Sequence, residues 1–97
     1  MELATAIEDI INKFEKGDYF DSHAVINELL KKDYHQVYLE AFPKDCTVAH
    51  YHGQIAQKIG ESGVAEKVHI KEKDVLVKTH TVYGDLSENH LWIRNRK

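Results

Sequence analysis

The 97-residue sequence has a single cysteine, Cys46, and a single proline, Pro43. One cysteine cannot form an intramolecular disulfide, which excludes a disulfide-stapled secreted scaffold and favours a reducing compartment. The apolar runs are only a few residues long, well short of the roughly 20 residues that a membrane-spanning helix needs. The first residues lack the basic and apolar regions of a secretory signal. We therefore expect a cytoplasmic protein with no membrane span.

Positive charge is also scarce, because 13 Lys and Arg residues against 16 Asp and Glu residues give a formal net charge of −3. The deficit lies in residues 1–60, which hold six basic and ten acidic residues, whereas residues 61–97 hold seven basic and six acidic ones. Freestanding nucleic-acid binders are usually more basic, since phosphate neutralisation supplies most of their affinity. The charge balance therefore counts against DNA as the partner. This objection is weakest for the C-terminal part, which is the less acidic half of the chain.

Hydrophobic residues make up 42% of the chain, which is enough for one buried core at this length and too little for two. No internal repeat, low-complexity segment or linker interrupts the sequence. We expect a single domain over residues 1–97, with a helical part at residues 1–60 and a β-hairpin or wing part at residues 64–95.

Helical spacing of apolar residues predicts an N-terminal bundle of three to four helices. The predicted helices cover residues 3–14, 22–32, 34–42 and 47–60, joined between the first two by a short link at residues 18–20. Asp21 or Ser22 is the expected N-cap of the second helix, and Thr47 that of the fourth. Pro43 ends the third helix, because the residue before a proline avoids the helical region.

Beyond Gly63 the apolar period changes from 3.6 to 2, which predicts strands. The predicted strands lie at residues 68–70, 75–83 and 91–93, with turns or loops at residues 71–74 and 84–89. Two hairpins are implied. The expected fold class is α+β, with the helical bundle followed by a small antiparallel sheet.

The predicted helix at residues 47–60 is the most informative segment, because its side chains divide into two faces. One face carries Val48, Tyr51, His52, Ile55 and Ile59, and the other carries His50, Gln54, Gln57 and Lys58. A core face opposite a stripe of hydrogen-bonding side chains suits a helix that recognises nucleic acid. Equally, the polar stripe suits the solvated side of any amphipathic helix. Gly53 costs about 1 kcal/mol relative to alanine in a helix, and close approach of another helix or of a ligand would explain it.

In the order of these elements, with helices opening at residues 21–23 and at Thr47 and a hairpin from residues 75–83 to 91–93, the chain resembles winged helix-turn-helix DNA-binding domains. The resemblance covers most of the chain and rests on topology. It implies that the helix at residues 47–59 lies in the major groove and that the basic hairpin rests on phosphates. The connection between residues 32 and 47 is longer than the three or four residues usual in the motif.

Carried onto this sequence, the resemblance implies two sets of contacts with duplex DNA. The base-contacting residues would be His50, Gln54, Gln57 and Lys58, since Gln pairs with adenine and Lys with guanine. The phosphate-contacting residues would be Lys71, Lys73 and Lys78 in the wing, or Arg94, Arg96 and Lys97 in the tail. A homodimer formed through surplus apolar surface on the first helix would raise the affinity.

A second hypothesis is a non-enzymatic protein-interaction module on the same scaffold, of the inhibitor or adaptor type found among small phage and mobile-element proteins. Acidic residues on the first three helices would then engage a basic protein partner. Exposed aromatic residues would serve either hypothesis, since Trp92 and Tyr83 on an open sheet face would form a stacking platform or an anchor. Core positions are the alternative for these two residues and for Tyr34 and Tyr38.

Enzymatic chemistry has no recognisable motif here, because the sequence has no nucleophile elbow, phosphate-binding glycine loop or HExxH helix. Cys46 and His50 are four residues apart, as a metal-binding pair or a nucleophile with its base would be. A zinc site usually needs a second close pair, and a catalytic pair needs a third, orienting group. Two interpretations of His69 and His80 remain open, namely that they face each other across strands or that they are scattered surface histidines. We expect no catalytic residue, metal or cofactor.

Overall fold

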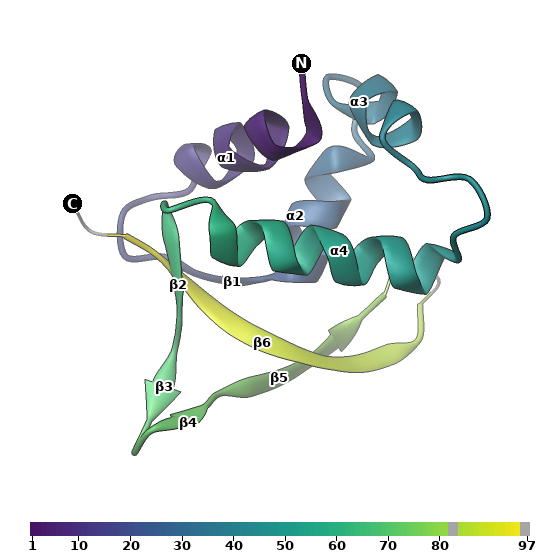
Figure 1. Ribbon diagram of the computed structural model, residues 1–97. Coiled ribbons are helices and arrows are strands. Elements are labelled where there is room, and N and C mark those ends of the chain that lie inside the picture. The colour runs from purple at the N-terminus through teal and green to yellow at the C-terminus, as the bar shows by residue number, and fades with distance from the viewer. Residues whose placement is uncertain (82–83, 96–97) are drawn as a thin grey trace.

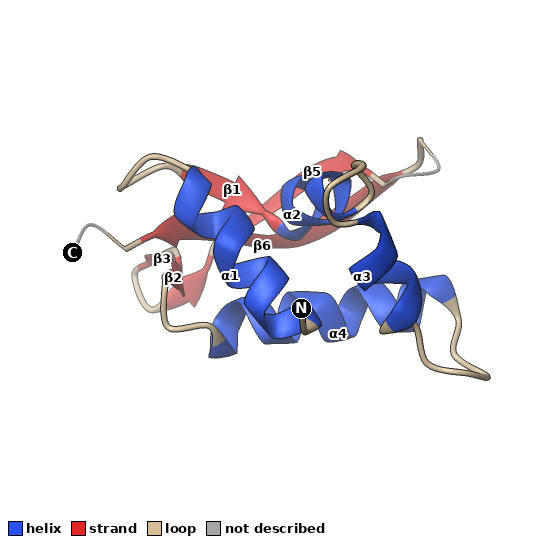
Figure 2. Cartoon of the chain, turned by 90° about the horizontal axis from the view of Figure 1, so that it is seen from above, coloured by secondary structure: helices blue, strands red, loops and turns tan. Residues whose placement is uncertain are grey.

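The computed structural model describes residues 1–81 and 84–95 and has the predicted α+β fold class, helices first and antiparallel strands after them (Figure 1). The helices are α1 (Leu3–Lys13), α2 (Ser22–Leu29), α3 (His35–Glu40) and α4 (Val48–Glu61). The strands are β1 (Tyr19–Asp21), β2 (Ala65–Lys67), β3 (His69–Ile70), β4 (Lys73–Asp74), β5 (Leu76–His80) and β6 (Leu86–Arg94). From above, the helices lie together on one side, with the main strands behind them (Figure 2).

Side-chain caps begin helices α2 and α4. The Asp21 carboxylate accepts a hydrogen bond from the Ala24 amide at 2.9 Å, and the Thr47 hydroxyl accepts one from the His50 amide at 3.1 Å. Each cap satisfies an amide that the helix itself leaves without a partner, which is worth about 1 kcal/mol. Both predicted caps are confirmed.

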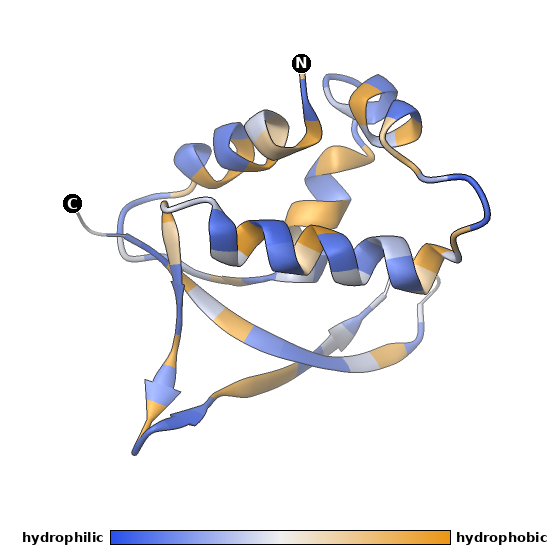
Figure 3. Ribbon diagram, in the orientation of Figure 1, coloured by the Kyte–Doolittle hydropathy of each residue, from blue (hydrophilic) through white to orange (hydrophobic). Residues whose placement is uncertain are grey.

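The core lies between the four helices and the facing side of the sheet. Its fully buried large side chains are Ile7, Ile10, Ile11, Val25, Ile26, Leu29, Tyr51, Ile55 and Ile59. Figure 3 shows the apolar stripes of α1 and α2 in orange along the sides that face the rest of the molecule. Tyr34, Tyr38 and Trp92 are also buried, as the core interpretation of the aromatic residues predicted. Tyr83 lies outside the described residues.

Strand β6 is the centre of the sheet and pairs antiparallel with every strand next to it. Its C-terminal half lies between β1 and β2, with Phe20 and Lys67 on either side of Trp92. Its N-terminal half pairs with β5, where Leu76 lies opposite His90 and His80 opposite Leu86. The short β3–β4 hairpin extends beyond this sheet (Figure 1).

Three predictions about the strands are wrong. The predicted link at residues 18–20 overlaps strand β1, and the predicted loop at residues 84–89 overlaps β6, which begins at Leu86. Both segments become strands because a distant partner offers backbone hydrogen bonds, which local sequence does not reveal. His69 and His80 do not face each other either, since His69 lies opposite Asp74 and His80 opposite Leu86.

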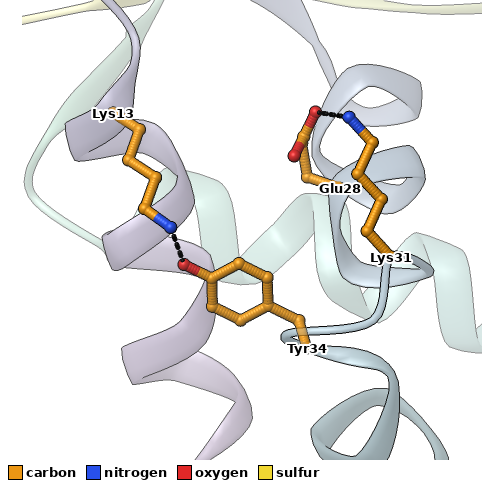
Figure 4. Close-up of polar contacts among 4 residues, drawn as sticks. All are labelled: Lys13, Glu28, Lys31 and Tyr34. Carbon is orange, nitrogen blue, oxygen red and sulfur yellow. Dashed lines mark hydrogen bonds and ion pairs between the residues drawn. The ribbon is translucent and has the colours of Figure 1, made fainter.

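A lysine on α1 joins that helix to the turn before α3. Lys13 Nζ donates a hydrogen bond of 2.5 Å to the Tyr34 hydroxyl and lies 4.7 Å from the centre of the same ring (Figure 4). This hydrogen bond raises the pKa of Lys13. The neighbouring pair in Figure 4, Lys31 and Glu28, closes the end of α2 at 2.6 Å. The Lys13–Tyr34 contact therefore joins α1 to the turn before α3, whereas the Lys31–Glu28 pair is local to the end of α2.

Candidate nucleic-acid interface

The outer face of α4 carries the four residues predicted to contact bases. His50 and Gln57 are exposed, while Gln54 and Lys58 are half-buried. One shallow depression is lined by Thr47, His50 and Gln54, and another by Gln54, Gln57 and Lys58. Because Gln54 belongs to both, the four side chains form one continuous surface, which we call the outer face of α4. Among the described residues, none that lines either depression belongs to a strand.

The opposite face of α4 is held by buried aromatic residues. Tyr51 donates a hydrogen bond of 2.7 Å to the Tyr38 carbonyl, and burial, then the charge of Tyr38, raises its pKa to about 12. The Tyr38 hydroxyl lies 2.8 Å from His52 Nε2. Burial, then the neighbouring His23, lowers the pKa of His52 from 6.5. These contacts attach α4 to α3 and fix which way the outer face points.

Glycines at two positions of α4 have different surroundings. A Cβ atom at Gly60 would lie 3.1 Å from Trp92 Cη2, so this glycine lets the indole ring pack against the helix. At Gly53, no atom of the described residues lies within 4 Å of the corresponding position, apart from its chain neighbours and the backbone of its own helix. The expectation that another helix approaches Gly53 is therefore wrong. Trp92 is only 5% exposed, which also excludes it from an open stacking platform.

The tip of the β3–β4 hairpin is a two-residue turn with an unusual backbone. Lys71 and Glu72 have φ angles of 52° and 67°, in the left-handed region that such turns require and that Asn-Gly adopts most easily. The backbone of any residue other than glycine is strained in this region, and backbone strain of this kind is concentrated at functional sites. Lys71 and Lys73 are exposed, and the tip extends away from the helices (Figure 1).

The other predicted phosphate contacts do not gather at this tip. Lys78 Nζ lies 3.9 Å from the Glu88 carboxylate on the paired strand. Arg94 is half-buried, and its Nη1 donates a hydrogen bond to the Phe14 carbonyl. This bond joins two residues that are 80 positions apart in the sequence. Arg96 and Lys97 lie outside the described residues. The residues that remain together in an exposed position are Lys71 and Lys73.

Two histidines, His69 and His90, lie beside Asp74 of the β3–β4 hairpin, and the sequence did not predict these contacts. Asp74 on β4 lies 2.7 Å from His69 Nε2 and 3.5 Å from His90 Nδ1, and Lys67 Nζ is 3.8 Å away. The His90 contact is within ion-pair distance, but its buried Nδ1 makes no hydrogen bond in the structure. The contact between His69 and Asp74 could not be predicted from the sequence, because it depends on the strand register that places these two residues opposite each other.

Among residues 1–81 and 84–95, no group of three or more His, Cys, Asp and Glu side chains is arranged to hold a metal ion. Cys46 Sγ donates instead to the Thr47 carbonyl at 3.4 Å. In the same part of the chain, no helix has the length and apolarity needed to cross a bilayer.

Helix α1 has little apolar surface left for the expected dimer. All of its apolar residues except Ala4 are in the core, namely Leu3, Ala6, Ile7, Ile10 and Ile11. The exposed residues are Ala4, Thr5, Glu8, Asp9, Asn12 and Lys13. A homodimer through an apolar face of α1 is therefore not supported by this arrangement.

Comparison with protein-family models, with curated proteins and with solved structures finds no match to this chain. Function is therefore inferred from side chains and their geometry alone. The two features available for that inference are the outer face of α4 and the exposed lysines at the β3–β4 tip.

Proposed function

We propose that this protein binds duplex nucleic acid, with α4 in the major groove and the β3–β4 tip on the phosphates. The observation that carries the proposal is the accessibility of the outer face of α4, which the hairpin does not cover. Burial of His50, Gln54, Gln57 and Lys58 beneath the sheet would have excluded this function.

The outer face has the chemistry and length for base contacts. Gln54 and Gln57 offer a donor and an acceptor on each amide, which matches the major-groove edge of adenine, and Lys58 matches guanine. From His50 to Lys58 the helix rises about 12 Å, at 1.5 Å per residue, comparable with the major-groove width of about 12 Å. The caps and buried tyrosines hold this face rigidly, which limits the entropy lost on binding.

Electrostatics suit weak binding rather than tight binding. The lysines available for phosphates are the exposed Lys71 and Lys73 and the half-buried Lys58, while Lys67 and Lys78 lie near Asp74 and Glu88. Three neutralised phosphates give a slope of about −3 for log K against log salt concentration. Most of the affinity is therefore expected below physiological ionic strength.

The test is fluorescence anisotropy of a labelled random-sequence duplex, titrated with protein at several salt concentrations. We expect measurable binding at low salt, abolished by combining Gln54→Ala with Lys58→Ala. Combining Lys71→Ala with Lys73→Ala should reduce the magnitude of the salt slope by about 2, or about 1 per phosphate contact.

A matched control removes two exposed lysines elsewhere, Lys16→Ala with Lys32→Ala. This pair causes the same change in net charge and should leave the salt slope almost unchanged. No binding at low salt to any duplex tested would exclude the proposal. An equal loss in the control pair would show that net charge alone, not the outer face and the tip, governs binding.

A second candidate function is binding of a basic protein partner through the first three helices. The observation that favours it is the exposure of Glu8 and Asp9 on α1 and of Glu40 beside Leu39 on α3, where Leu39 is 52% exposed. Pull-down from a lysate of the source should then recover a basic protein. Combining Glu8→Lys with Asp9→Lys should abolish its capture, and unchanged capture would exclude this acidic surface.

A further inference from the structure

Strand β5 is paired along one edge only. It pairs with β6, and no other described strand lies along its second edge. At one end of this pair, the Leu91 amide donates a hydrogen bond of 2.9 Å to the Val75 carbonyl. Hydrogen-bonded pairs alternate with non-hydrogen-bonded pairs in an antiparallel ladder. The amides and carbonyls of three residues of β5 therefore point away from β6, namely those of Leu76, Lys78 and His80.

These outward backbone groups have no partner in the part of the chain that the structure describes. Outside the β5–β6 ladder, no hydrogen bond between described residues involves a backbone group of Leu76, Lys78 or His80. Figure 2 shows β5 at the outer margin of the molecule. A strand with an open edge can accept a further strand, which bonds to the same groups. We call this second edge of β5, at residues 76–80, the open edge.

The side chains beside the open edge are exposed on the outward face of the β5–β6 pair. On β5 this face carries Leu76, Lys78 and His80, and on β6 it carries Leu86 and Glu88. Leu76 is 51% exposed and Leu86 is 63% exposed. Large apolar side chains and a lysine are therefore available to a strand laid along this edge.

The inward face of the same pair is already engaged inside the protein. The Thr79 hydroxyl donates to Asp21 at 2.6 Å, and Asn89 Nδ2 lies 3.3 Å from the Thr79 oxygen. Ser87 and Asn89 line a cleft of about 280 Å³ against α2 and α4, and Gly53 lines it from α4. Selectivity for an added strand is therefore expected from the outward face.

Lys78 lies at the centre of the open edge and is only loosely paired. Its side chain is 67% exposed, and its Nζ lies 3.9 Å from the Glu88 carboxylate, beyond hydrogen-bond distance. An exposed ion pair of this kind contributes little, so the ammonium group remains available to a second carboxylate.

The charge of Lys78 also discriminates between possible occupants of the open edge. In the antiparallel register that pairs all of β5 with a second copy of itself, Lys78 would lie opposite the same lysine. Like charges directly opposite each other destabilise a sheet, and opposite charges stabilise it. A second copy is therefore disfavoured, and a strand with an acidic residue at this position is favoured.

We infer that the open edge of β5 binds an extended acidic peptide segment as an added antiparallel strand. A carboxylate of the peptide lies opposite Lys78, and an apolar side chain two residues away lies opposite Leu76. Main-chain hydrogen bonds supply the affinity, and these two side-chain contacts supply the selectivity. The site is separate from the proposed nucleic-acid interface, since none of its residues belongs to the outer face of α4 or to the β3–β4 tip.

The test compares two peptides with capped ends, Thr-Leu-Thr-Glu-Thr-Leu-Thr and the same sequence with lysine in place of glutamate. Each is titrated into the ¹⁵N-labelled protein near pH 7 and followed by amide chemical shifts. We expect saturable binding of the acidic peptide with a dissociation constant below about 1 mM. The basic peptide should bind at least about threefold more weakly. The largest shifts should be at Leu76, Lys78 and His80.

Amide hydrogen exchange measures strand addition directly. In the free protein, the amides of Leu76, Lys78 and His80 should exchange fast, whereas those of Val77 and Thr79, which face β6, should exchange slowly. With the acidic peptide at about ten times its dissociation constant, exchange of the three fast amides should slow about tenfold. N-methylation of the glutamate and both leucines removes the peptide donors that face β5 and should abolish this protection.

Three variants test the charge at the centre of the edge. Lys78→Glu reverses it and should make the basic peptide the tighter ligand. Lys78→Gln removes it and should bind the two peptides within about twofold of each other. Lys32→Glu, at an exposed position after α2, causes the same change in net charge as Lys78→Glu. It is the matched control and should keep the preference for the acidic peptide.

Several results would overturn the inference. Absence of saturable binding of the acidic peptide excludes the site, and equal binding of both peptides excludes an acidic segment as the occupant. Shifts and protection centred away from β5 exclude this location. Protection of the edge amides that rises with protein concentration, without peptide, would identify a second copy as the occupant instead. Duplex binding is measured separately, so its failure or success leaves these outcomes distinguishable.

Discussion

The two faces of α4 are built from the same helix and have opposite surroundings. On the inner face, Tyr51, Ile55 and Ile59 are at most 1% exposed, whereas His50 and Gln57 on the outer face lie in solvent. Full burial of a large apolar side chain contributes about 1.5–3 kcal/mol, and an exposed glutamine contributes little. Stability and the proposed binding are therefore carried by different residues of one helix, and mutation should separate them.

The largest expected effect comes from the inner face. Ile55→Ala removes three carbons from a fully buried site and should lower the free energy of unfolding by about 2–5 kcal/mol through lost burial and a residual cavity. Urea unfolding followed by circular dichroism measures this change. Gln57→Ala on the outer face is the matched control and should change stability by less than about 0.5 kcal/mol. Similar losses at both positions would contradict the division between the faces.

An intermediate effect is expected at the edge between the faces. Gly53→Ala should raise the free energy of unfolding by about 1 kcal/mol, because alanine is the better helix former and its methyl group would contact no described residue beyond its chain neighbours and the backbone of its own helix. Gly60→Ala is the comparison, since its methyl group would lie 3.1 Å from the Trp92 ring, which offsets the gain. The same urea experiment measures both. A greater gain at Gly60 than at Gly53 would show that the packing of Trp92 is not limiting.

The smallest effect concerns His52, whose surroundings include His23, Tyr38 and Tyr51. Its pKa is lowered from 6.5 in the folded protein, mainly by burial, so the unfolded chain binds the proton more readily. The stabilisation is complete above pH 6.5 and is lost as the pH falls through the folded-state pKa.

His52→Gln should therefore flatten the decline in urea midpoint between about pH 6.5 and pH 5, since this variant has no imidazole to protonate at that position. The control is His35→Gln, at an exposed position, which should decline as the unmodified protein does. Identical pH profiles for the His52 variant and the unmodified protein would refute the role of its burial.

Local signals in the sequence were sufficient to predict where the helices lie. The apolar spacing, the caps at Asp21 and Thr47 and the stop at Pro43 act within a few residues, so each could be predicted without knowing the fold. The same period separated the outer face of α4 from its core face. Four of the proposed contacts, His50 to Lys58, therefore come directly from the sequence.

The strands and the cleft depend on contacts that no local pattern encodes. β1 exists because Tyr19 pairs with Ile93, and β6 continues through residues 86–89 because β5 lies beside them. Arg94 was predicted to contact phosphate, but its guanidinium reaches the Phe14 carbonyl. Such pairings join residues far apart in the chain, so a polar or short segment gives no sign of them beforehand.

The sequence by itself determined the α+β order of elements, the start of α2 and α4, and the polar stripe from His50 to Lys58, because helix formation is governed by neighbours within one or two turns. Only the tertiary structure decided that the stripe is accessible, that Lys71 and Lys73 are exposed together at a tip strained at Lys71 and Glu72, and that Gly53 opens onto a cleft. Those outcomes depend on strand β6, which pairs with β1 from the N-terminal part of the chain and with β2 and β5 from the C-terminal part. Pairing between residues so far apart in the sequence cannot be predicted from local patterns.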